Sequence, residues 1–244
     1  MAAQFEQHPF LLSAEDVAKQ LNSDLDRGLT SSQVTQLQQT YPLNELDVGG
    51  AIPWYKIFIK QLLNAMILVL FFALALSFAV GDYIEGGVLA AVIVLNVSIG
   101  FFQEYGAEKK MDALRALSSP SAMVLRDGRT EVIANAEVVP GDVVILKMGD
   151  TIPADVRLFE AMNLAADEQS LTGESLPVEK TVDPLKDTDL GIGDRINIAY
   201  GTTTVQKGRG RGIVISTGME TEVGKIAAVS DNRTSGLRKE LLVA

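Results

Sequence analysis

The segment with the clearest potential for chemistry is Thr172-Gly173-Glu174-Ser175, which lies between predicted strands. A glycine in such a segment lets the backbone turn sharply and approach another surface closely. Glu174 would then be presented outward at the tip of a loop, between two hydroxyl groups. A carboxylate in that place can accept a proton from a water molecule and orient the water for attack. As an isolated tetrapeptide the segment favours a structural turn, so a chemical role depends on its surroundings.

Other polar residues favour structural roles. Asp142, Asp150 and Asp155 each lie beside or close to Gly or Pro, where Asp favours local backbone bonding, so we do not expect them to form a cation site. The alternation of glycine with basic residues at 207–212 could bind phosphate or acidic lipid, but a solvated turn is favoured. Cysteine is absent and His8 has no partner histidine. We therefore expect neither a metal site nor a bound cofactor in this chain.

Charge and hydrophobicity are segregated along the sequence. The chain of 244 residues is 47% hydrophobic and 21% charged, and nearly all the charge lies in 1–61 and 103–244. This distribution predicts a membrane protein with a sizeable water-soluble part. The net charge of −10 argues against nucleic acid as a partner, because binding to phosphates needs a basic surface. The first ten residues have no apolar core, so no cleaved signal peptide is expected.

Two apolar runs are long enough to cross a lipid bilayer. Leu62–Val80 is nineteen residues without a charge. As a helix it would span about 28 Å, close to the bilayer core of about 30 Å. The second run, Gly86–Phe102, is extended at its start by Tyr83 and Ile84. We predict transmembrane helices at 62–80 and 84–102, joined by a tight acidic loop.

The flanking charges predict the orientation of this hairpin. Lys56 and Lys60 precede the first span, Lys109, Lys110 and Arg115 follow the second, and the connecting loop has no Lys or Arg. By the positive-inside rule, both hydrophilic parts of the chain are cytosolic. The polar residues within the spans are expected to bond between helices rather than to form an ion pathway; they are Asn64, Ser77, Asn96 and Ser98.

The remaining residues predict three further parts. Residues 1–50 form a cytosolic helical domain, with Ser13 capping a helix at Ala14–Leu21 and a capping box at Thr30–Gln33 opening a second helix. Residues 51–117 hold the two spans and a stalk that continues the second helix. Residues 231–244 look like a linker that is cut short.

A period of two predicts that 118–230 form a mostly β domain, a distorted jelly roll. The predicted strands are Met123–Arg126, Glu131–Ala134, Val143–Lys147, Val156–Glu160, Ile196–Gln206 and Gly212–Thr217.

Together these features resemble the type II P-type cation-transporting ATPases, and the β domain resembles their actuator domain. The matching strings, in order, are Val139-Pro140-Gly141-Asp142, Gly149–Asp155, Asp167-Glu168, Leu171–Val178 and Thr217–Ile226. Gly28-Leu29-Thr30, Tyr41 and Asn44-Glu45-Leu46 are similar to the N-terminal segment of cation ATPases. The chain looks most like the fungal sodium/potassium-exporting branch at Asp82–Val88, Ile99–Tyr105, Gly193–Tyr200 and Lys207–Gly212, although calcium pumps share the general pattern.

The resemblance implies the roles of the loop residues. Glu174 would position or deprotonate the water that hydrolyses an aspartyl phosphate, Thr172 and Ser175 would help to hold it, and Gly173 would permit the approach. The phosphorylated aspartate and the nucleotide-binding domain would be the partners of this domain, with ATP and Mg implied for the full-length parent. Monovalent cations would pass through later helices in the lipid bilayer, with the plasma membrane favoured over an internal one.

Two interpretations of the whole chain remain open. The Asp-Lys-Thr-Gly run that carries the phosphorylated aspartate in this family is not in the sequence. The chain is either a piece of an ion-pumping enzyme or a naturally short, non-enzymatic membrane protein that associates with a full-length pump. Calcium is the alternative to sodium and potassium as the transported ion.

Overall fold

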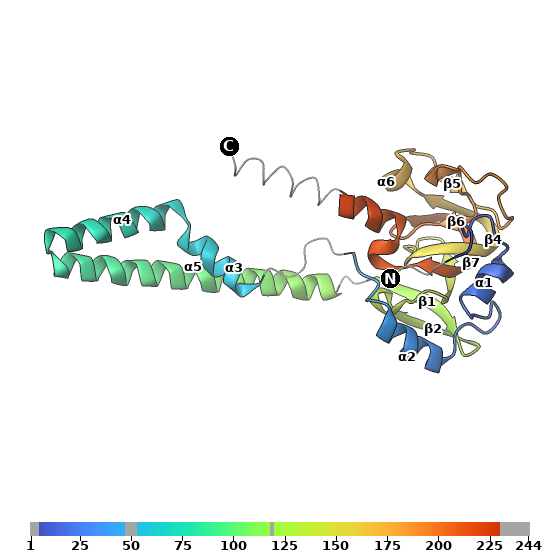
Figure 1. The fold of residues 1–244 in the computed structure, drawn as a ribbon, viewed down its shortest axis with the longest axis horizontal. Helices are drawn as coiled ribbons and strands as arrows, with labels where there is room; N and C mark the ends of the chain where they lie inside the picture. Colours follow the sequence, from blue (N-terminus) through green and yellow to red (C-terminus); the bar gives the residue numbers. More distant parts are fainter. Residues whose placement is uncertain (1–4, 47–52, 118–119, 230–244) are drawn as a thin grey trace. The chain divides into compact units, whose positions relative to one another are not determined.

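The β-rich part of the chain forms a single antiparallel sheet. The computed structural model describes residues 5–46, 53–117 and 120–229, and Figure 1 shows their elements. The strands follow the order β2-β1-β3-β7-β4-β5, and β6 pairs with β4. Their bounds are β1 (Ser121–Arg126), β2 (Arg129–Ala134), β3 (Val143–Lys147), β4 (Asp155–Asp167), β5 (Val178–Glu179), β6 (Ile198–Ala199) and β7 (Thr204–Ser216). The prediction of a mostly β domain is confirmed.

Short helices complete this part of the chain. The α-helix α6 (Gln169–Thr172) follows β4, and the 3₁₀ helices are η1 (Asn135–Glu137), η2 (Ile192–Asp194) and η3 (Gly218–Glu220). A further helix covers residues 222–229. The main core gathers buried apolar side chains from β1, β3, β4 and β7, among them Val124, Leu146, Leu158 and Val214. Their removal from water is the main contribution to the stability of the sheet.

The course of β7 differs from the prediction. A solvated turn was expected at 207–212, with separate strands on either side, but β7 runs through it from Thr204 to Ser216. The glycines are needed because β4 lies too close to admit side chains. A Cβ on Gly210 would come 2.6 Å from the carbonyl oxygen of Glu160, and one on Gly212 would overlap the neighbouring β4 residues. These glycines therefore permit close packing of two long strands.

The N-terminal segment, predicted as a helical domain at 1–50, lies in the same compact unit as the sheet. Helix α1 (Ala14–Gln20) is capped by Ser13 and buries Val17 and Ala18 against the sheet. Helix α2 (Ser31–Thr40) begins with the predicted capping box, which is confirmed. The predicted helices therefore form, and their apolar faces are covered by the β domain.

Two polar side chains hold this segment in place. Asn44 donates to the carbonyl oxygen of Pro153 at 2.9 Å and accepts from the amide of Gly218 at 2.8 Å. Arg157, which has no exposed surface, donates to the carbonyl oxygens of Pro9 at 3.2 Å and Leu12 at 3.0 Å. Buried polar groups of this kind require partners, so the N-terminal segment and the sheet depend on each other.

The second unit consists of α3 (Trp54–Leu62), α4 (Ala65–Val80) and α5 (Tyr83–Leu117). The predicted first span at 62–80 is wrong at its start. The chain leaves helical geometry after Leu62, and Asn64 caps α4 by accepting a hydrogen bond from the Met66 amide at 3.0 Å. Helices α3 and α4 therefore meet at a bend of 57°. An asparagine side chain that accepts from the amide two residues ahead competes with helix continuation.

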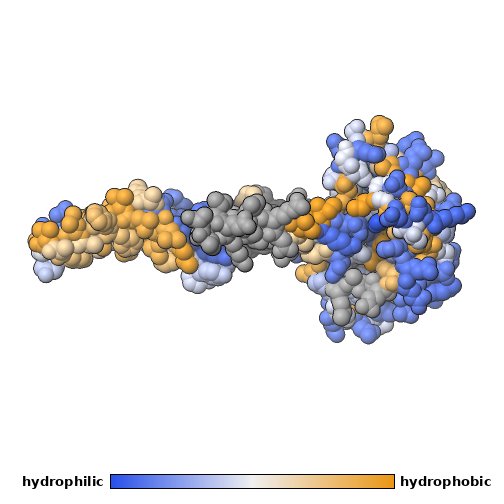
Figure 2. Space-filling model, turned by 45° about the horizontal axis from the view of Figure 1, so that its top comes forward, coloured by the Kyte–Doolittle hydropathy of each residue, from blue (hydrophilic) through white to orange (hydrophobic). Residues whose placement is uncertain are grey.

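Helix α5 is by itself long and apolar enough to cross a membrane, over Tyr83–Met111. The α3 and α4 pair passes the same test only when the two helices are taken together. Figure 2 shows the apolar surface over α4 and α5. Phe72 is 73% exposed and Ile84 is 84% exposed, whereas Ile67 and Ile93 are buried between the helices.

Polar residues in α4 and α5 bond locally. Ser77 donates to the carbonyl oxygen of Asp82 at 2.9 Å, and Asn96 donates to the carbonyl oxygen of Val92 at 3.0 Å. With Asn64 at the helix cap, three of the four residues predicted to bond between helices instead bond within their own helix or turn. Packing between α4 and α5 therefore rests mainly on apolar contacts, whereas Lys60 and Gln61 of α3 both donate to the Glu104 carboxylate of α5 at 2.6 Å.

Candidate functional site

The predicted Thr172–Ser175 loop leaves one strand and returns to that same strand. Helix α6 follows the end of β4, and the chain then comes back as β5, in which Val178 pairs with Ala166 of β4. Figure 1 shows α6 and β5 together at one end of the β unit. The loop is thus anchored at both ends on β4.

Backbone hydrogen bonds shape the start of the loop. The carbonyl oxygen of Glu168 accepts from the amides of Leu171 and Thr172, each at 2.9 Å, and from Thr172 Oγ1 at 3.1 Å. Thr172 Oγ1 in turn accepts from the amide of Glu174 at 3.2 Å. Gly173 lies between them with φ of 78°. A side chain in this left-handed region would cost about 1–2 kcal/mol.

The tip of the loop is presented to solvent. Gly173, Glu174 and Ser175 are all exposed, whereas Thr172 is half-buried. The structure therefore links Thr172 and Glu174 by a hydrogen bond from the Glu174 amide to the Thr172 side chain, and it leaves Ser175 exposed to solvent. Such a loop can deliver a carboxylate to a reacting group that is held on another surface.

A buried ion pair closes the base of this loop. Glu168 precedes α6 and Lys180 follows β5; both side chains have no exposed surface, and their charged groups are in direct contact. Burial raises the pKa of Glu168 and lowers the pKa of Lys180, because each charge has lost its hydration, and each partner opposes the shift of the other. Sequence reasoning does not find this pair, because nothing in the spacing of a Glu and a Lys around a polar loop indicates that they meet.

Aromatic and glycine residues pack around the pair and the loop. Lys180 Nζ lies 5.4 Å from the centre of the Tyr200 ring. The hydroxyl of Tyr200 donates to the Ile192 carbonyl oxygen of η2 at 2.7 Å. A Cβ on Gly193 of η2 would lie 3.2 Å from the methyl carbon of Thr172. The loop is therefore supported from below by η2 as well as by the ion pair.

A second buried ion pair lies elsewhere in the sheet. Arg126 donates from Nε and Nη2 to the two carboxylate oxygens of Asp142, at 2.8 and 2.7 Å. Burial lowers the pKa of Arg126, but the hydrogen bonds and charge of Asp142, together with the charges of Glu131 and Glu137, leave the pKa raised. Asp150 accepts from the amide of Lys147 at 2.9 Å. Both aspartates thus have structural partners, and among the described residues no cluster of three or more His, Asp or Glu could hold a metal ion.

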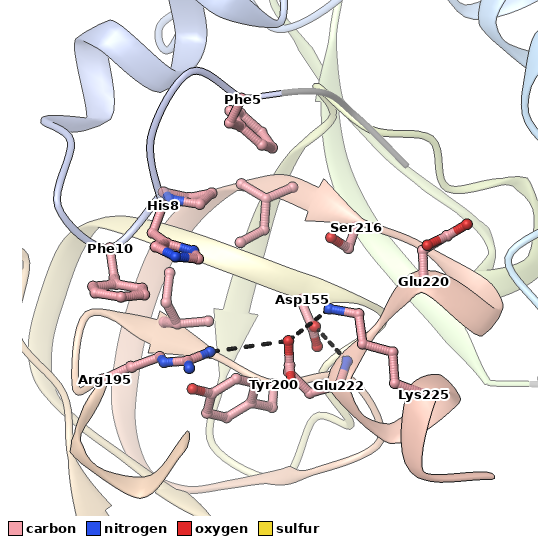
Figure 3. Close-up of a pocket in the computed structure, with 13 residues that line it drawn as sticks. Phe5, His8, Phe10, Asp155, Arg195, Tyr200, Ser216, Glu220, Glu222 and Lys225 are labelled. Atoms are coloured by element: carbon pink, nitrogen blue, oxygen red, sulfur yellow. Dashed lines mark hydrogen bonds and ion pairs between the residues drawn. The ribbon is translucent and has the colours of Figure 1, made fainter. Parts of the chain in front are cut away.

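Asp155 borders a cavity of about 190 Å³ between the N-terminal segment and the sheet, shown in Figure 3. Its carboxylate accepts from the amide of Glu222 at 2.8 Å, and burial raises its pKa to about 6. The Glu222 carboxylate contacts Lys225 at 2.8 Å and lies 4.0 Å from Arg195. The Glu222 carboxylate thus has two cationic neighbours, and the Asp155 hydrogen bond joins β4 to the helix at 222–229.

Two known protein families match successive parts of the chain. Residues 116–231 match the P-type ATPase actuator domain. Residues 10–77 match the N-terminal domain of cation transporters and ATPases. The first match contains the whole loop and both buried ion pairs.

Individual relatives extend this likeness. The chain is 48% identical over 216 residues to a sodium/potassium exporting P-type ATPase of Schizosaccharomyces pombe, covering 88% of this chain and 21% of the relative. It is 45% identical to sodium/potassium exporting P-type ATPase 1 of Saccharomyces cerevisiae, covering 88% and 20%. A calcium-transporting ATPase of Listeria monocytogenes is 42% identical, covering 89% and 24%. The chain therefore spans about a fifth to a quarter of the length of these relatives.

Proposed function

Because the chain belongs to the P-type ATPase family and contains its N-terminal and actuator domains, we propose that it is the N-terminal part of an ATP-driven monovalent cation export pump. In this proposal the loop at Thr172–Ser175 hydrolyses an aspartyl phosphate carried by another domain. One observation supports it above the others. Glu174 is exposed at the tip of the loop, while its amide is linked through Thr172 Oγ1 to the backbone of the buried residue Glu168.

The proposed reaction needs one water molecule and one base. The water oxygen attacks the phosphorus atom of the aspartyl phosphate, and the Glu174 carboxylate accepts a proton from that water. The bond between phosphorus and the aspartate oxygen breaks, which releases inorganic phosphate and a free carboxylate. Thr172 and Ser175 help to hold this water, and Gly173 lets the tip approach. ATP and magnesium are assigned to domains outside this chain.

Placement of the loop governs the rate in this scheme. Phosphoryl transfer is catalysed almost entirely by positioning and electrostatic stabilisation. Holding the water molecule in line with the bond that breaks lowers the barrier mainly through orientation. The protein's contribution is therefore a rigid loop base and an accessible tip.

We propose further that the second unit spans the membrane as a hairpin, with α3 and α4 as one bent span. Large apolar side chains such as Phe72 and Ile84 face outward on these helices. Exposing such area to water costs about 25 cal/mol per Å², so a lipid environment is favoured. Lys and Arg flank the hairpin and are absent from its turn, which favours cytosolic ends. The hairpin would transmit movement of the actuator domain to the ion gate.

The proposed cargo is sodium or potassium, exported across the plasma membrane. The 48% identity to a sodium/potassium exporter, against 42% to a calcium-transporting ATPase, favours this assignment over calcium. Expression of the full-length pump in a host that lacks its own exporters would test it. Restored growth in high sodium supports the assignment, and restored growth in high calcium alone contradicts it.

The decay of phosphoenzyme tests the proposed role of the loop. In the full-length pump, Glu174→Gln should still permit phosphorylation from ATP but slow dephosphorylation by about a hundredfold, because a positioned general base contributes about 10²–10⁴ in rate. The matched control is Glu179→Gln, which alters an exposed glutamate of β5. Decay of Glu174→Gln at the rate of the control would exclude the proposed role.

A further inference from the structure

We propose that the buried pair of Glu168 and Lys180 is a positioning device for Glu174, which sets how fast the loop hydrolyses the aspartyl phosphate. This inference rests on the proposed function of the loop. Glu168 and Lys180 do not touch the reacting atoms. They act by fixing the two ends of the loop that presents Glu174.

Three contacts lead from the buried ammonium to the exposed tip. Lys180 contacts the Glu168 carboxylate, the Glu168 carbonyl oxygen accepts from Thr172 Oγ1 at 3.1 Å, and Thr172 Oγ1 accepts from the Glu174 amide at 3.2 Å. The two charged residues flank the segment that contains the loop, one immediately before α6 and one immediately after β5. A shift of either end would therefore move the backbone of Glu174.

The elements around the loop are too short to fix it alone. Helix α6 has four residues, about one turn, and β5 has two residues. One turn of helix is not stable by itself, and a two-residue strand makes few ladder bonds. The two ends of the loop therefore need another constraint. The ion pair supplies it, because Glu168 lies immediately before the start of α6 and Lys180 lies immediately after the end of β5.

The energetics also favour a positioning role over a stabilising one. Both side chains are fully buried. Desolvating two charges costs about as much as their attraction returns, and apolar replacements of similar volume are often neutral or stabilising. Two apolar side chains could fill this space, but they would slide against each other more freely. A direct contact between one ammonium and one carboxylate specifies a single arrangement.

The domain contains a matched control for this argument. Arg126 and Asp142 form a second buried ion pair, with bonds of 2.8 and 2.7 Å, and neither side chain bonds to the loop. Removing one partner of either pair should reduce the amount of folded pump, because the other charge is left buried and unpaired. If position matters, only loss of the Glu168–Lys180 pair should change the rate constant of dephosphorylation.

The test uses the full-length pump and follows decay of the phosphoenzyme that forms. A rate constant measured this way does not depend on how much pump is folded. Lys180→Met should slow decay by about tenfold to a hundredfold, the loss expected from a small misplacement of a reacting group. Asp142→Asn should decay within about twofold of wild type. Equal rate constants in wild type, Lys180→Met and Asp142→Asn would show that the pair is only structural.

A second variant covers the case in which Lys180→Met fails to fold with an unpaired buried carboxylate. Glu168→Gln/Lys180→Met removes both charges, so its thermal stability should lie close to that of wild type while its decay stays slow. Wild-type decay in the double variant overturns the inference. Glu174→Gln in the same assay separates the two proposals: slow decay there with normal decay in the pair variants rejects only the positioning role, and normal decay in Glu174→Gln rejects the function of the loop itself.

Discussion

The carboxylate of Asp155 lies at the start of the helix at 222–229, where it accepts a hydrogen bond from the Glu222 amide at 2.8 Å. Its other oxygen accepts from the amide of Gly201 at 2.9 Å. The first amides of a helix have no partner within it, so a side chain from a distant strand serves as the cap. One buried aspartate therefore connects β4, the turn before β7 and the last described helix.

This cap should make stability depend on pH. Burial raises the pKa of Asp155 from 3.8 to about 6. The folded state then holds the proton more tightly than the unfolded chain, so the contribution of Asp155 to stability is present below pH 4 and is lost as pH rises towards 6. The loss amounts to about 3 kcal/mol. Thermal unfolding of the detergent-solubilised chain between pH 4 and 6.5 measures it.

The control variants isolate Asp155 from the other carboxylates. Asp155→Asn keeps a hydrogen-bond acceptor but cannot ionise, so it should flatten the decline in this pH window. Asp150→Asn, which changes a bonded aspartate in a turn, should leave the decline in place. An unchanged pH profile in Asp155→Asn would assign the decline to other groups.

Arg157 should anchor the N-terminal segment. Burial lowers its pKa to about 10, and its guanidinium donates to the carbonyl oxygens of Pro9, Leu12 and Val182. Arg157→Met leaves these buried acceptors without a donor, at a cost of about 1–3 kcal/mol for each group that stays unsatisfied. Hydrogen exchange of residues 9–21 should accelerate more than exchange of β1. Arg129→Met, on the exposed start of β2, should change neither.

The close packing of β7 on β4 should make Gly212 intolerant of a methyl group. An added Cβ would lie 2.3 Å from Cγ1 of Val156 and 2.8 Å from the carbonyl oxygen of Arg157. We expect Gly212→Ala to cost clearly more than Gly128→Ala, about 3 kcal/mol or more, because overpacking forces the two strands apart. Gly128→Ala, which places a side chain at a positive φ of 73° but has open space around it, should cost only about 1–2 kcal/mol. Denaturation midpoints compare the two, and equal losses would contradict the packing argument.

The bend between α3 and α4 should depend on Asn64. Asn64→Leu removes the cap of α4, which costs about 1 kcal/mol, and favours a continuous helix. Because the chain has no cysteine, spin labels can be attached through Lys56→Cys and Phe72→Cys without background labelling. The distance between the labels should lengthen as the 57° bend opens. Asn96→Leu, which removes a local bond in α5, should leave it unchanged.

Local sequence signals predicted much of this fold. The Thr30 capping box, the alternating strands and the continuous second helix each depend on residues close in sequence, and each is present. The glycines at 207–212 were misleading, because an isolated glycine signals a turn as readily as a close approach between strands. The break between α3 and α4 could not be predicted without knowing that the Asn64 side chain bonds a backbone amide.

Long-range partners could not be predicted in this way. Arg157 meets residues 145 and 148 positions away, and Glu168 meets Lys180 only because β5 returns to β4. No periodicity records such pairings. The four loop residues were found because they lie together in one short string, whereas the residues that support them are scattered. Their chemical roles stay predictions until the kinetics are measured.

The discontinuous β unit also has a consequence for biosynthesis. The chain is made from its N-terminus, so Pro9 and Leu12 leave the ribosome long before Arg157. The entire helical unit at 49–119 is synthesised in the interval. The apolar face of the N-terminal segment therefore stays uncovered while the helical unit is synthesised and folds. Only when the strands that follow have emerged can the N-terminal residues complete the domain to which they belong.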